Sequence, residues 1–426
     1  MNKRVVITGM GVAAPNAHGV DDFERALREG RSGVRFIPQL RELNFGCQIA
    51  GVPENFNEIR KSYFDREKLM SINDNIGFAS VAAVDAWKDA GFDLTDDDDN
   101  KVDWDTGVIA GSGIGGMDTI ATMVVPQINE GKVRRMGSRI VEQVMGSGTS
   151  ARISGLIGAG NQVTSNSSAC STGNEAVIEA LWRIRMGLAK RMVAGGSEGA
   201  SPYIWGGFDA MRVICRKFND NPEAGSRPMS ASAAGFVPGS GGAMLVLEDL
   251  ETALARGARI YAEITGGYVN CGGQRMGGTM TAPNPEGVRR CVRGAMADAG
   301  IDAAEVDAIN GHLTATYADP YEVKSWAAAL ERTPENFPYI QATKSLVGHC
   351  LGAAGSIECV ASIIQLHKGF LHPSINCEDV HPEIAEYAPK IVQKCMEYPD
   401  LKIIAKAGFG FGDVNSCIIF KKWEGK

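Results

Sequence analysis

The chain contains 426 residues with a formal net charge of −7, and 44 % of its residues are hydrophobic and 22 % charged. These values are ordinary for a globular protein with room for two or three domain-sized units, and the negative charge disfavours nucleic acid or an anionic membrane surface as partners. No segment reaches the ~18 continuous apolar residues that a membrane-spanning helix requires, and the ten scattered cysteines include no C-x-x-C zinc or redox motif.

The first predicted strand, residues 5–12, lies close to the N-terminus and ends in a glycine turn. Its apolar run is too short for a secretory signal peptide. Together with the cysteine pattern, which does not resemble a disulfide-rich scaffold, this predicts a reduced, cytoplasmic protein.

Short apolar runs that end in glycine recur along the chain and alternate with helical patterns. Strands are predicted at 108–110 and 192–194, and helices at 76–90 and 175–186. The acidic run 96–99 is expected to be a solvated loop or the end of a helix, because it lacks the alternating ligands and terminal Glu of a calcium loop. The alternation of strands and helices predicts an α/β architecture with buried sheets.

The second half of the chain repeats the pattern of the first. After a strand at 243–247 and a short helix, residues 259–267 resemble residues 4–11 in combining a basic residue, a β-run, Thr and Gly. We therefore predict an N-terminal half, residues 1–255, and a C-terminal half, residues 256–426. No Pro/Ser-rich linker separates them, so we expect them to pack as one body. The C-terminal half has its own predicted helix and final strand, at 288–299 and 416–420.

Cys170 is the strongest candidate for chemistry. It lies in residues 165–173, between a polar stretch and a helical pattern. The backbone N–H groups and dipole of that helix would favour a negative charge on the sulfur and lower the thiol pKa from its free value of ~8.5. The alternative is a buried, unreactive cysteine.

Two of the six histidines lie in similar surroundings. His312 follows an apolar run, and His349 lies in a glycine-rich segment, residues 344–355, that also contains Lys344. The other four lie in polar or proline-flanked contexts, where we expect surface or structural roles: His18, His367, His372 and His381.

Neither glycine-rich segment fits nucleotide binding. Residues 111–116 lack the spacing and the acidic partner of a dinucleotide-binding fingerprint, and residues 344–355 lack the Gly-Lys-Ser/Thr of a phosphate-binding loop. Close helix packing is the alternative role for Gly348, Gly352 and Gly355.

One cysteine and two histidines at glycine-rich loops suit acyl transfer through a thioester. The cysteine can hold the acyl group covalently, and unobstructed backbone N–H groups can bind the tetrahedral oxyanion. Two imidazoles can donate hydrogen bonds to an enolate formed when a carboxylated donor loses carbon dioxide. Residues 408–412 are the candidate for a second oxyanion donor and for a gate.

Five segments, in this order and at this spacing, resemble the elongating β-ketoacyl-acyl-carrier-protein synthases (types I and II) of the thiolase-fold condensing enzymes. They are residues 5–11, residues 168–173, His312-x-Thr314-x-Thr316, residues 344–355 and residues 408–415. The resemblance spans nearly the whole chain and implies a five-layered αβαβα fold of two duplicated halves, assembled as a homodimer. It also implies substrates carried on the phosphopantetheine arm of acyl carrier protein, with no cofactor and no metal.

The resemblance further implies roles for individual residues. Cys170 would be the acylated nucleophile, while His312 and His349 would assist decarboxylation of malonyl carrier protein and stabilise the enolate. Lys344 would be a fixed positive charge, with Glu358 as its acidic neighbour. The other implied positions are the oxyanion-hole donors on Cys170 and Phe411 with the adjoining Gly410, the pantetheine-binding Thr281, Thr314 and Thr316, and the tunnel residue Ile114.

The chain departs from the family pattern at several loops. Leu313 and Ala315 replace flexible residues after His312, and the loop to Asp319 is one residue shorter than usual. Met229 and Asp413 mark two further altered segments. These departures bear on acyl-chain preference and pantetheine contacts. A specialised synthase subunit of a secondary-metabolite pathway is therefore an alternative to a synthase that extends fatty acids or related polyketide or polyene chains.

Other functions predict different features. A non-elongating partner subunit would normally lack the nucleophile, and a degradative thiolase would use a second cysteine near the C-terminus, where Cys417 is the nearest. A non-catalytic protein that only binds carrier protein would not be labelled by a thioester. An acidic carrier protein also needs a local basic patch, for which the candidates are Lys61, Arg66, Lys68, Lys132, Arg134 and Arg135.

Overall fold

A computed structural model describes residues 3–94 and 100–425 of the chain, so the acidic run 96–99 lies outside the described residues. One large mixed sheet runs through the molecule in the order β11-β10-β14-β15-β9-β1-β8-β7-β5-β6. The strands of its N-terminal part are β1 (Val5–Ala14), β5 (Thr106–Gly111), β6 (Val163–Thr164), β7 (Arg191–Glu198) and β8 (Gly241–Asp249). Those of its C-terminal part are β9 (Ala262–Cys271), β10 (Ala308–Asn310), β11 (Tyr339–Gln341), β14 (Ile403–Gly410) and β15 (Val414–Lys422).

The two parts of this sheet have the same topology. Numbered within each half, the strands follow the order 3-2-4-5-1 in both. In both, the second strand pairs in parallel with the third and fourth, while the fifth pairs antiparallel with the fourth and the first. This identity confirms the predicted duplication. The halves join where β1 pairs antiparallel with β9, at Val5–Ile7 and Ala262–Ile264.

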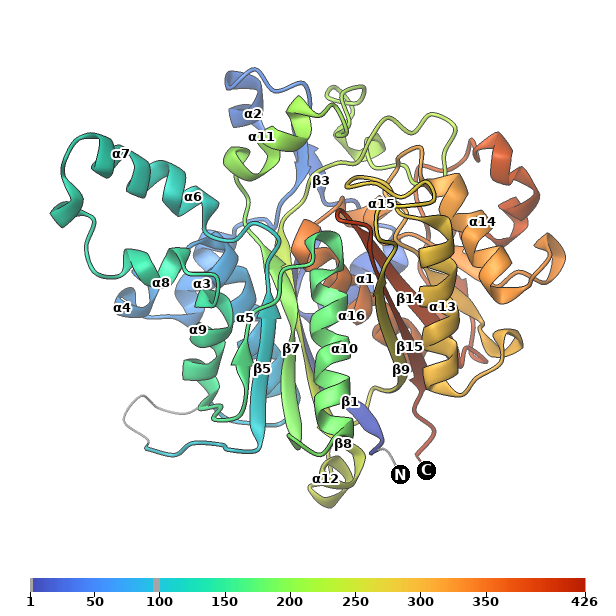
Figure 1. The fold of residues 1–426 in the computed structure, drawn as a ribbon, viewed down its shortest axis with the longest axis horizontal. Helices are drawn as coiled ribbons and strands as arrows, with labels where there is room; N and C mark the ends of the chain where they lie inside the picture. Colours follow the sequence, from blue (N-terminus) through green and yellow to red (C-terminus); the bar gives the residue numbers. More distant parts are fainter. Residues whose placement is uncertain (1–2, 95–99, 426) are drawn as a thin grey trace.

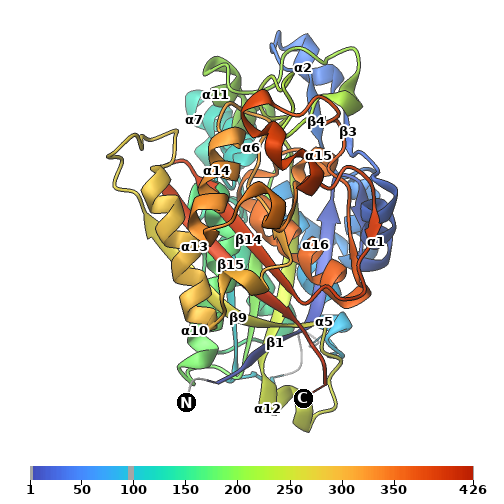
Figure 2. The ribbon, with the colours of Figure 1, turned by 90° about the vertical axis from the view of Figure 1, so that its right-hand side faces the viewer.

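Helices complete the five layers (Figures 1 and 2). The central helices α10 (Thr172–Arg185) and α16 (Ala354–Lys368) contact each other and strands of both halves. Helices α5 (Asp74–Asp89) and α9 (Gly148–Ile157) cover the outer face of the N-terminal strands. Helix α13 (Pro285–Ala299) lies along β9 and β15, with α14 (Asp319–Leu330) beside it.

The remaining elements form the periphery and the loops. Small sheets pair β3 (Val34–Phe36) with β4 (Ile49–Gly51) and β12 (Phe370–Leu371) with β13 (Met396–Glu397), while β2 (Ala17–His18) pairs with β1. The other α-helices are α1 (Val20–Glu29), α2 (Pro38–Glu42), α3 (Phe56–Tyr63), α4 (Arg66–Leu69), α6 (Met117–Thr119), α7 (Val125–Asn129), α8 (Ile140–Val144), α11 (Pro202–Ala210), α12 (Leu250–Ala255) and α15 (Lys344–Val347). A π-helical turn η1 (Ile120–Val124) and the 3₁₀ turns η2 (Val133–Arg135), η3 (Ala169–Ser171), η4 (Pro222–Ala224), η5 (Ala303–Glu305), η6 (Pro334–Asn336), η7 (Leu351–Ala353) and η8 (Pro382–Lys390) complete the chain.

The predicted strands and helices are all present, mostly with longer ends. The strand that opens the second half begins at Ala262 rather than at residue 259, and the helices predicted at 76–90 and 175–186 end one residue earlier, at Asp89 and Arg185. A division after residue 255 stays a prediction; residue 255 is the last residue of α12. Among the described residues, no helix has the length and apolar character needed to cross a membrane.

Two glycines explain how closely the central helices approach each other. A Cβ at Gly173 would lie 2.5 Å from the backbone N of Ser356, and one at Gly355 would lie 2.6 Å from the backbone N of Asn174. Any larger residue would push the starts of α10 and α16 apart, because real Cβ contacts do not occur at such distances. This close approach brings the segment before α10, from the first half, against the segment before α16, from the second.

Candidate active site

Cys170 lies on a strained turn between β6 and α10. It is the middle residue of η3, and the preceding Ala169 has a left-handed φ of 48°. Thr172 holds the turn: its hydroxyl donates to the Ala169 carbonyl and accepts from the Ser168 N–H, each at 2.8 Å. A non-glycine residue in this conformation costs free energy, which the surrounding bonds offset. The turn presents the sulfur at the N-terminal end of α10.

The second half supplies a hydrogen-bonding group directly opposite the sulfur. His349 Nε2 lies 3.1 Å from Cys170 Sγ. The backbone N–H of Leu351 donates to His349 Nδ1 at 3.3 Å, so the neutral ring carries its proton on Nε2. His349 therefore faces Cys170 as a hydrogen-bond donor.

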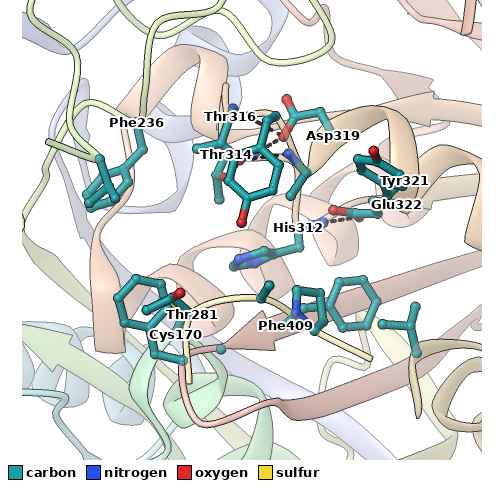
Figure 3. A pocket seen from close by; sticks show the side chains of 18 of the residues that line it. Cys170, Phe236, Thr281, His312, Thr314, Thr316, Asp319, Tyr321, Glu322 and Phe409 are labelled. Carbon is teal, nitrogen blue, oxygen red and sulfur yellow. Dashed lines mark hydrogen bonds between the residues drawn. The ribbon is translucent and has the colours of Figure 1, made fainter. Parts of the chain in front are cut away.

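His312 completes the cluster. Its ring centroid lies 5.5 Å from that of His349, nearly perpendicular to it, and Phe409 flanks it on β14 (Figure 3). The Cys170 sulfur, one ring nitrogen of His312 and one ring nitrogen of His349 all lie within 4.8 Å of one another. Both histidines are buried, and both have a pKa well below the ordinary value of 6.5, first because burial disfavours the charged ring and then because Lys344 repels it. The two imidazoles are thus neutral near pH 7.

Two buried carboxylates on α14 hold the loop after His312. Glu322 accepts the backbone N–H groups of His312 and Leu313, at 2.6 and 2.7 Å (Figure 3). Asp319 accepts those of Thr314, Ala315 and Thr316. Burial raises the pKa of Glu322 to about 7. These two carboxyl groups therefore hold five consecutive backbone N–H groups, from His312 to Thr316, which fixes the loop along its whole length.

The residues at which the sequence departs from the family pattern share one backbone feature. Leu313 (φ 23°), Ala315 (φ 62°), Met229 (φ 65°) and Asp413 (φ 63°) all have positive φ. Side chains disfavour this region, which glycine adopts freely. Asp319 also accepts the Met229 N–H, at 2.9 Å, so one carboxylate holds two of these segments.

Lys344 and Glu358 lie behind the histidines. Their side chains are 2 % and 1 % exposed, and Lys344 Nζ lies 2.5 Å from Glu358 Oε1. Lys344 is the first residue of α15, and Glu358 lies in the second turn of α16. The predicted pairing of these two residues is present in the structure.

The loop from Gly408 to Asp413 packs over the nucleophile from β14. A Cβ at Gly410 would lie 3.1 Å from the backbone N of Cys170, and the Phe411 backbone N–H donates to the sulfur. The Asp413 carboxylate accepts the backbone N–H groups of Gln274 and Asn284, at 2.9 and 2.7 Å. Asp413 thereby ties this loop to the 272–284 loop, which contains Thr281.

These groups converge on a cavity of about 400 Å³ (Figure 3). Eight of the predicted site residues line it: Cys170, Thr281, His312, Thr314, Thr316, His349, Gly410 and Phe411. Lys344 and Glu358 are outside the lining. Ile114 is also outside it; this side chain packs instead against the hydrophobic cluster that contains Phe236 and Leu351, two residues of the cavity wall.

The expected lowering of the Cys170 pKa is wrong. The residue is only partly buried because it faces the cavity, but protein encloses the sulfur. Burial raises the pKa of the thiol to about 11, against the opposing effects of Lys344 and the Phe411 N–H. The sequence pattern predicts the helix that follows Cys170, but it does not show that the fold surrounds the sulfur.

The sequence did not identify Lys406 and Glu322 as residues of the site, nor Asp319 as the acceptor that holds the loop after His312. Lys406 lies on β14 and is fully buried, 2.7 Å from Glu358 Oε2. A lysine within the otherwise apolar run 403–407 was the available signal, because an unpaired lysine is rarely buried.

Comparisons with known proteins agree with this arrangement. The N-terminal domain model of the β-ketoacyl synthases matches residues 2–253, and the C-terminal domain model matches residues 261–378. The chain belongs to the β-ketoacyl synthase family. This membership confirms the predicted thiolase-like fold and the predicted condensing acyltransferase.

Full-length relatives extend the match. The chain is 35 % identical to 3-oxoacyl-[acyl-carrier-protein] synthase 1 of Haemophilus influenzae, over 99 % of this chain and 100 % of that one. It is similar to a β-ketoacyl synthase from Burkholderia phymatum, with a TM-score of 0.89 and 31 % identity, over 99 % and 100 % of the two chains. A type II polyketide ketosynthase, solved with its acyl carrier protein and a bound hexaketide, gives a TM-score of 0.87 at 27 % identity, with the same coverage.

The thiolase alternative does not fit the structure. Cys417 is fully buried on β15 within the core of the second half, and burial raises its pKa to about 12. It is absent from the cavity lining. A second catalytic cysteine is therefore not at this position.

Proposed function

We propose that this β-ketoacyl synthase extends an acyl chain held on Cys170 by decarboxylative condensation with malonyl carrier protein. The observation that carries the proposal is the convergence of Cys170, His349 and His312 at one end of the cavity, with donor atoms within 4.8 Å of one another. One nucleophile and two neutral imidazoles are the groups that this reaction needs.

In the loading step, Cys170 sulfur attacks the thioester carbonyl of the acyl carrier. The bond to the pantetheine sulfur breaks, the acyl group stays on Cys170, and the proton lost from the thiol is balanced by one gained by the departing pantetheine thiol. The Cys170 and Phe411 N–H groups are the donors for the tetrahedral oxyanion. The thiol is protonated at rest, so proton removal is part of this step.

In the condensing step, malonyl carrier protein loses carbon dioxide and its thioester carbonyl becomes an enolate. His349 donates its Nε2 proton to the enolate oxygen as a hydrogen bond, and His312 is the second donor. The enolate carbon attacks the acyl carbonyl on Cys170, and the thiolate leaves. A neutral imidazole with a fixed N–H suits this role because it stabilises charge without transferring a proton.

Thr281, Thr314 and Thr316 lie along the cavity wall, where their hydroxyls are suited to the amide groups of a phosphopantetheine arm. The Thr314 and Thr316 hydroxyls lie 3.0 Å apart, so one can donate to the other and keep a lone pair for the ligand. For Ile114 we retain only an indirect role in chain length, through the cluster behind the wall.

Acyl carrier protein is the proposed partner, as in the solved polyketide ketosynthase complex. Lys61 on α3, Arg66 and Lys68 on α4, and Arg134 and Arg135 on η2 are candidates for the basic patch. Arg139, just before α8, donates to Glu67 of α4 and so links α4 to the chain that follows η2. We also propose a homodimer and a cytoplasmic location; in support of the latter, all ten cysteines are free thiols.

We propose that the reaction uses no metal. Cys170, His312 and His349 could in principle bind a soft cation. The sulfur must be free for acylation, and the buried lysines behind the histidines repel a cation. Removing metal with a chelator is therefore expected to leave the condensation rate unchanged; a loss that zinc restores would contradict this.

A specialised secondary-metabolite synthase is the second candidate. It is favoured by the type II polyketide ketosynthase among the structural relatives and by the departures from the family pattern around the site, at Leu313, Ala315, Met229 and Asp413. Assay of a panel of acyl primers of different length and unsaturation distinguishes it from fatty acid synthesis.

Substitution of Cys170 tests the main proposal. Cys170→Ala should abolish acyl loading and condensation, while Cys170→Gln, which fills the space of an acylated cysteine, should still release carbon dioxide from malonyl carrier protein. The control is Cys215→Ala, a buried cysteine outside the cavity lining. Condensation at the wild-type rate by Cys170→Ala would overturn the proposal.

A further inference from the structure

Lys406 is a second lysine that the fold buries completely behind the active site. Its Nζ lies 2.7 Å from Glu358 Oε2 and also donates to the Ala407 carbonyl. The other Glu358 oxygen is paired with Lys344. One buried carboxylate therefore lies between two buried lysines, and we call these three residues the Lys–Glu–Lys cluster.

The cluster carries an excess of positive charge. Both contacts of Lys406 Nζ are to acceptors, which is the environment of an ammonium group. Two ammonium groups and one carboxylate leave a net charge of +1. Buried charge of this kind is costly unless it is paired, and a single Lys344–Glu358 pair would already have been neutral. The second lysine therefore needs a reason beyond pairing.

The cluster lies next to the segments that carry the two histidines: Lys406 is opposite Asn310 where β14 pairs with β10, two residues before His312, and Lys344 opens the helix that leads to His349. Lys344 and Lys406 both lower the pKa of His312 and of His349, in addition to the effect of burial. The other ionisable groups that interact electrostatically with this cluster are Cys170, Glu322, Cys350, Cys359, His372 and Cys417. Two further carboxyl groups act on these residues: Glu198 on Cys170 and Cys350, and Asp319 on Glu322.

We propose that Lys406 is a positioning residue for the condensation: by pairing with the second oxygen of Glu358, it leaves the cluster with a positive charge that keeps both imidazoles neutral. Neutral imidazoles hold the N–H donors that the enolate needs, so this inference rests on the proposed function. Lys406 acts through Glu358 and the histidines and is absent from the cavity lining.

The test removes the charge in two ways. Lys406→Gln keeps a polar side chain of similar length without the charge, and Lys406→Met keeps only the length of the side chain. In both, the remaining Lys344–Glu358 pair is neutral, so the histidines should become easier to protonate. The control is Lys402→Gln, which removes an exposed lysine from the segment leading into β14.

The first readout is the pH profile of condensation. The quantity compared is the condensation rate at about pH 5.5 divided by the rate at about pH 8. We expect this ratio to be lower in both Lys406 variants than in wild type, by about threefold or more, because the pKa of the histidines rises toward 6.5. Lys402→Gln should retain the wild-type ratio. An unchanged ratio in both Lys406 variants would overturn the inference, because a purely structural role predicts a uniform loss at every pH.

A charge-restoring double variant provides a second test. Lys406→Gln combined with Glu358→Gln leaves only Lys344 charged, which returns the net charge to +1. The double variant should recover the wild-type ratio of rates even if its absolute rate stays low. A ratio that falls further than in the single variant would contradict the electrostatic role.

The second readout does not depend on the reaction. The chain has only six histidines, so nuclear magnetic resonance of selectively labelled histidine can follow His312 and His349 directly. In Lys406→Gln their titration should move to higher pH than in the wild type. If the wild-type protein does not condense substrates but this shift is present, the proposed function fails while the effect of Lys406 stands. If the wild-type enzyme is active but His312 and His349 titrate at the same pH in Lys406→Gln as in the wild type, only the proposed role of Lys406 is refuted.

Discussion

At the scale of the residue, the site depends on hydrogen bonds that fix proton positions. The Leu351 N–H determines which nitrogen of His349 carries the proton, and that nitrogen faces Cys170 at 3.1 Å. Burial and nearby lysines keep the ring neutral. His349 is thus prepared as a donor before any substrate binds.

This neutrality predicts a pH dependence of stability. The folded-state pKa of His349 lies well below the unfolded value of about 6.5, so the stability it contributes is present above that value and is lost as pH falls. Between about pH 8 and pH 5.5, wild type should lose about 1.4 kcal/mol more unfolding free energy than His349→Gln. Urea unfolding at the two pH values measures this.

The matched control for this experiment is His381→Gln, at a partly exposed histidine outside the site. It should show the same pH dependence as the wild type. An equal loss of stability in wild type and His349→Gln would show that His349 is not held neutral by the fold.

At the scale of the element, two kinds of segment place these residues. The central helices meet through Gly173 and Gly355, which lets a turn of the first half touch a turn of the second. The loop after His312 keeps its positive φ values because Asp319 and Glu322 bind its N–H groups. Packing and buried carboxylates together give the site its geometry.

Alanine substitutions at two helical glycines should have opposite effects. Gly173→Ala places a Cβ 2.5 Å from Ser356 N and is expected to destabilise the fold by about 1–3 kcal/mol, while slowing acyl loading. Gly155→Ala, on α9 with nothing within 4 Å of the new Cβ, should instead stabilise by about 0.5–1 kcal/mol. Thermal unfolding distinguishes them, and a neutral Gly173→Ala would refute the close-packing argument.

The sequence pattern predicted six long strands and four helices, because apolar runs ending in glycine and helical periodicity are local signals; these elements are β1, β5, β7, β8, β9, β15, α5, α10, α12 and α13. It also identified Cys170, His312 and His349, whose neighbours along the chain carry the pattern. It could not predict the raised pKa of Cys170 or the second lysine beside Glu358, because both depend on groups that are far apart in sequence. The positive φ of Leu313 and Asp413 could not be predicted either, because Leu and Asp rarely adopt this conformation.

At the scale of the whole molecule, the site lies where the two duplicated halves meet, and neither half contains all of it. Cys170 comes from the first half, and both histidines and both buried lysines come from the second. The first half also extends an arm of α6, η1 and α7 away from the body (Figure 1). Several apolar residues in and after this arm are exposed: Met123, Val125, Ile128, Val133, Val141 and Met145.

These exposed apolar residues support the proposed homodimer, because exposed apolar side chains that gather in one segment are typical of an interface. We expect a dimer in sedimentation experiments at micromolar concentration. Val141→Asp should shift the protein toward monomer, while Leu254→Asp, at a similarly exposed apolar residue on α12, should not. A monomeric wild-type protein would contradict the proposed assembly.

The central claim is that Cys170 carries the growing chain, and intact-protein mass spectrometry tests it most directly. After incubation with acyl carrier protein bearing an acyl group, the protein should gain the mass of one acyl group, located on Cys170 by peptide mapping. Addition of malonyl carrier protein should remove this mass and produce a 3-oxoacyl carrier protein. No adduct, or an adduct on an exposed cysteine such as Cys271 or Cys395 that malonyl carrier protein does not remove, would contradict the account.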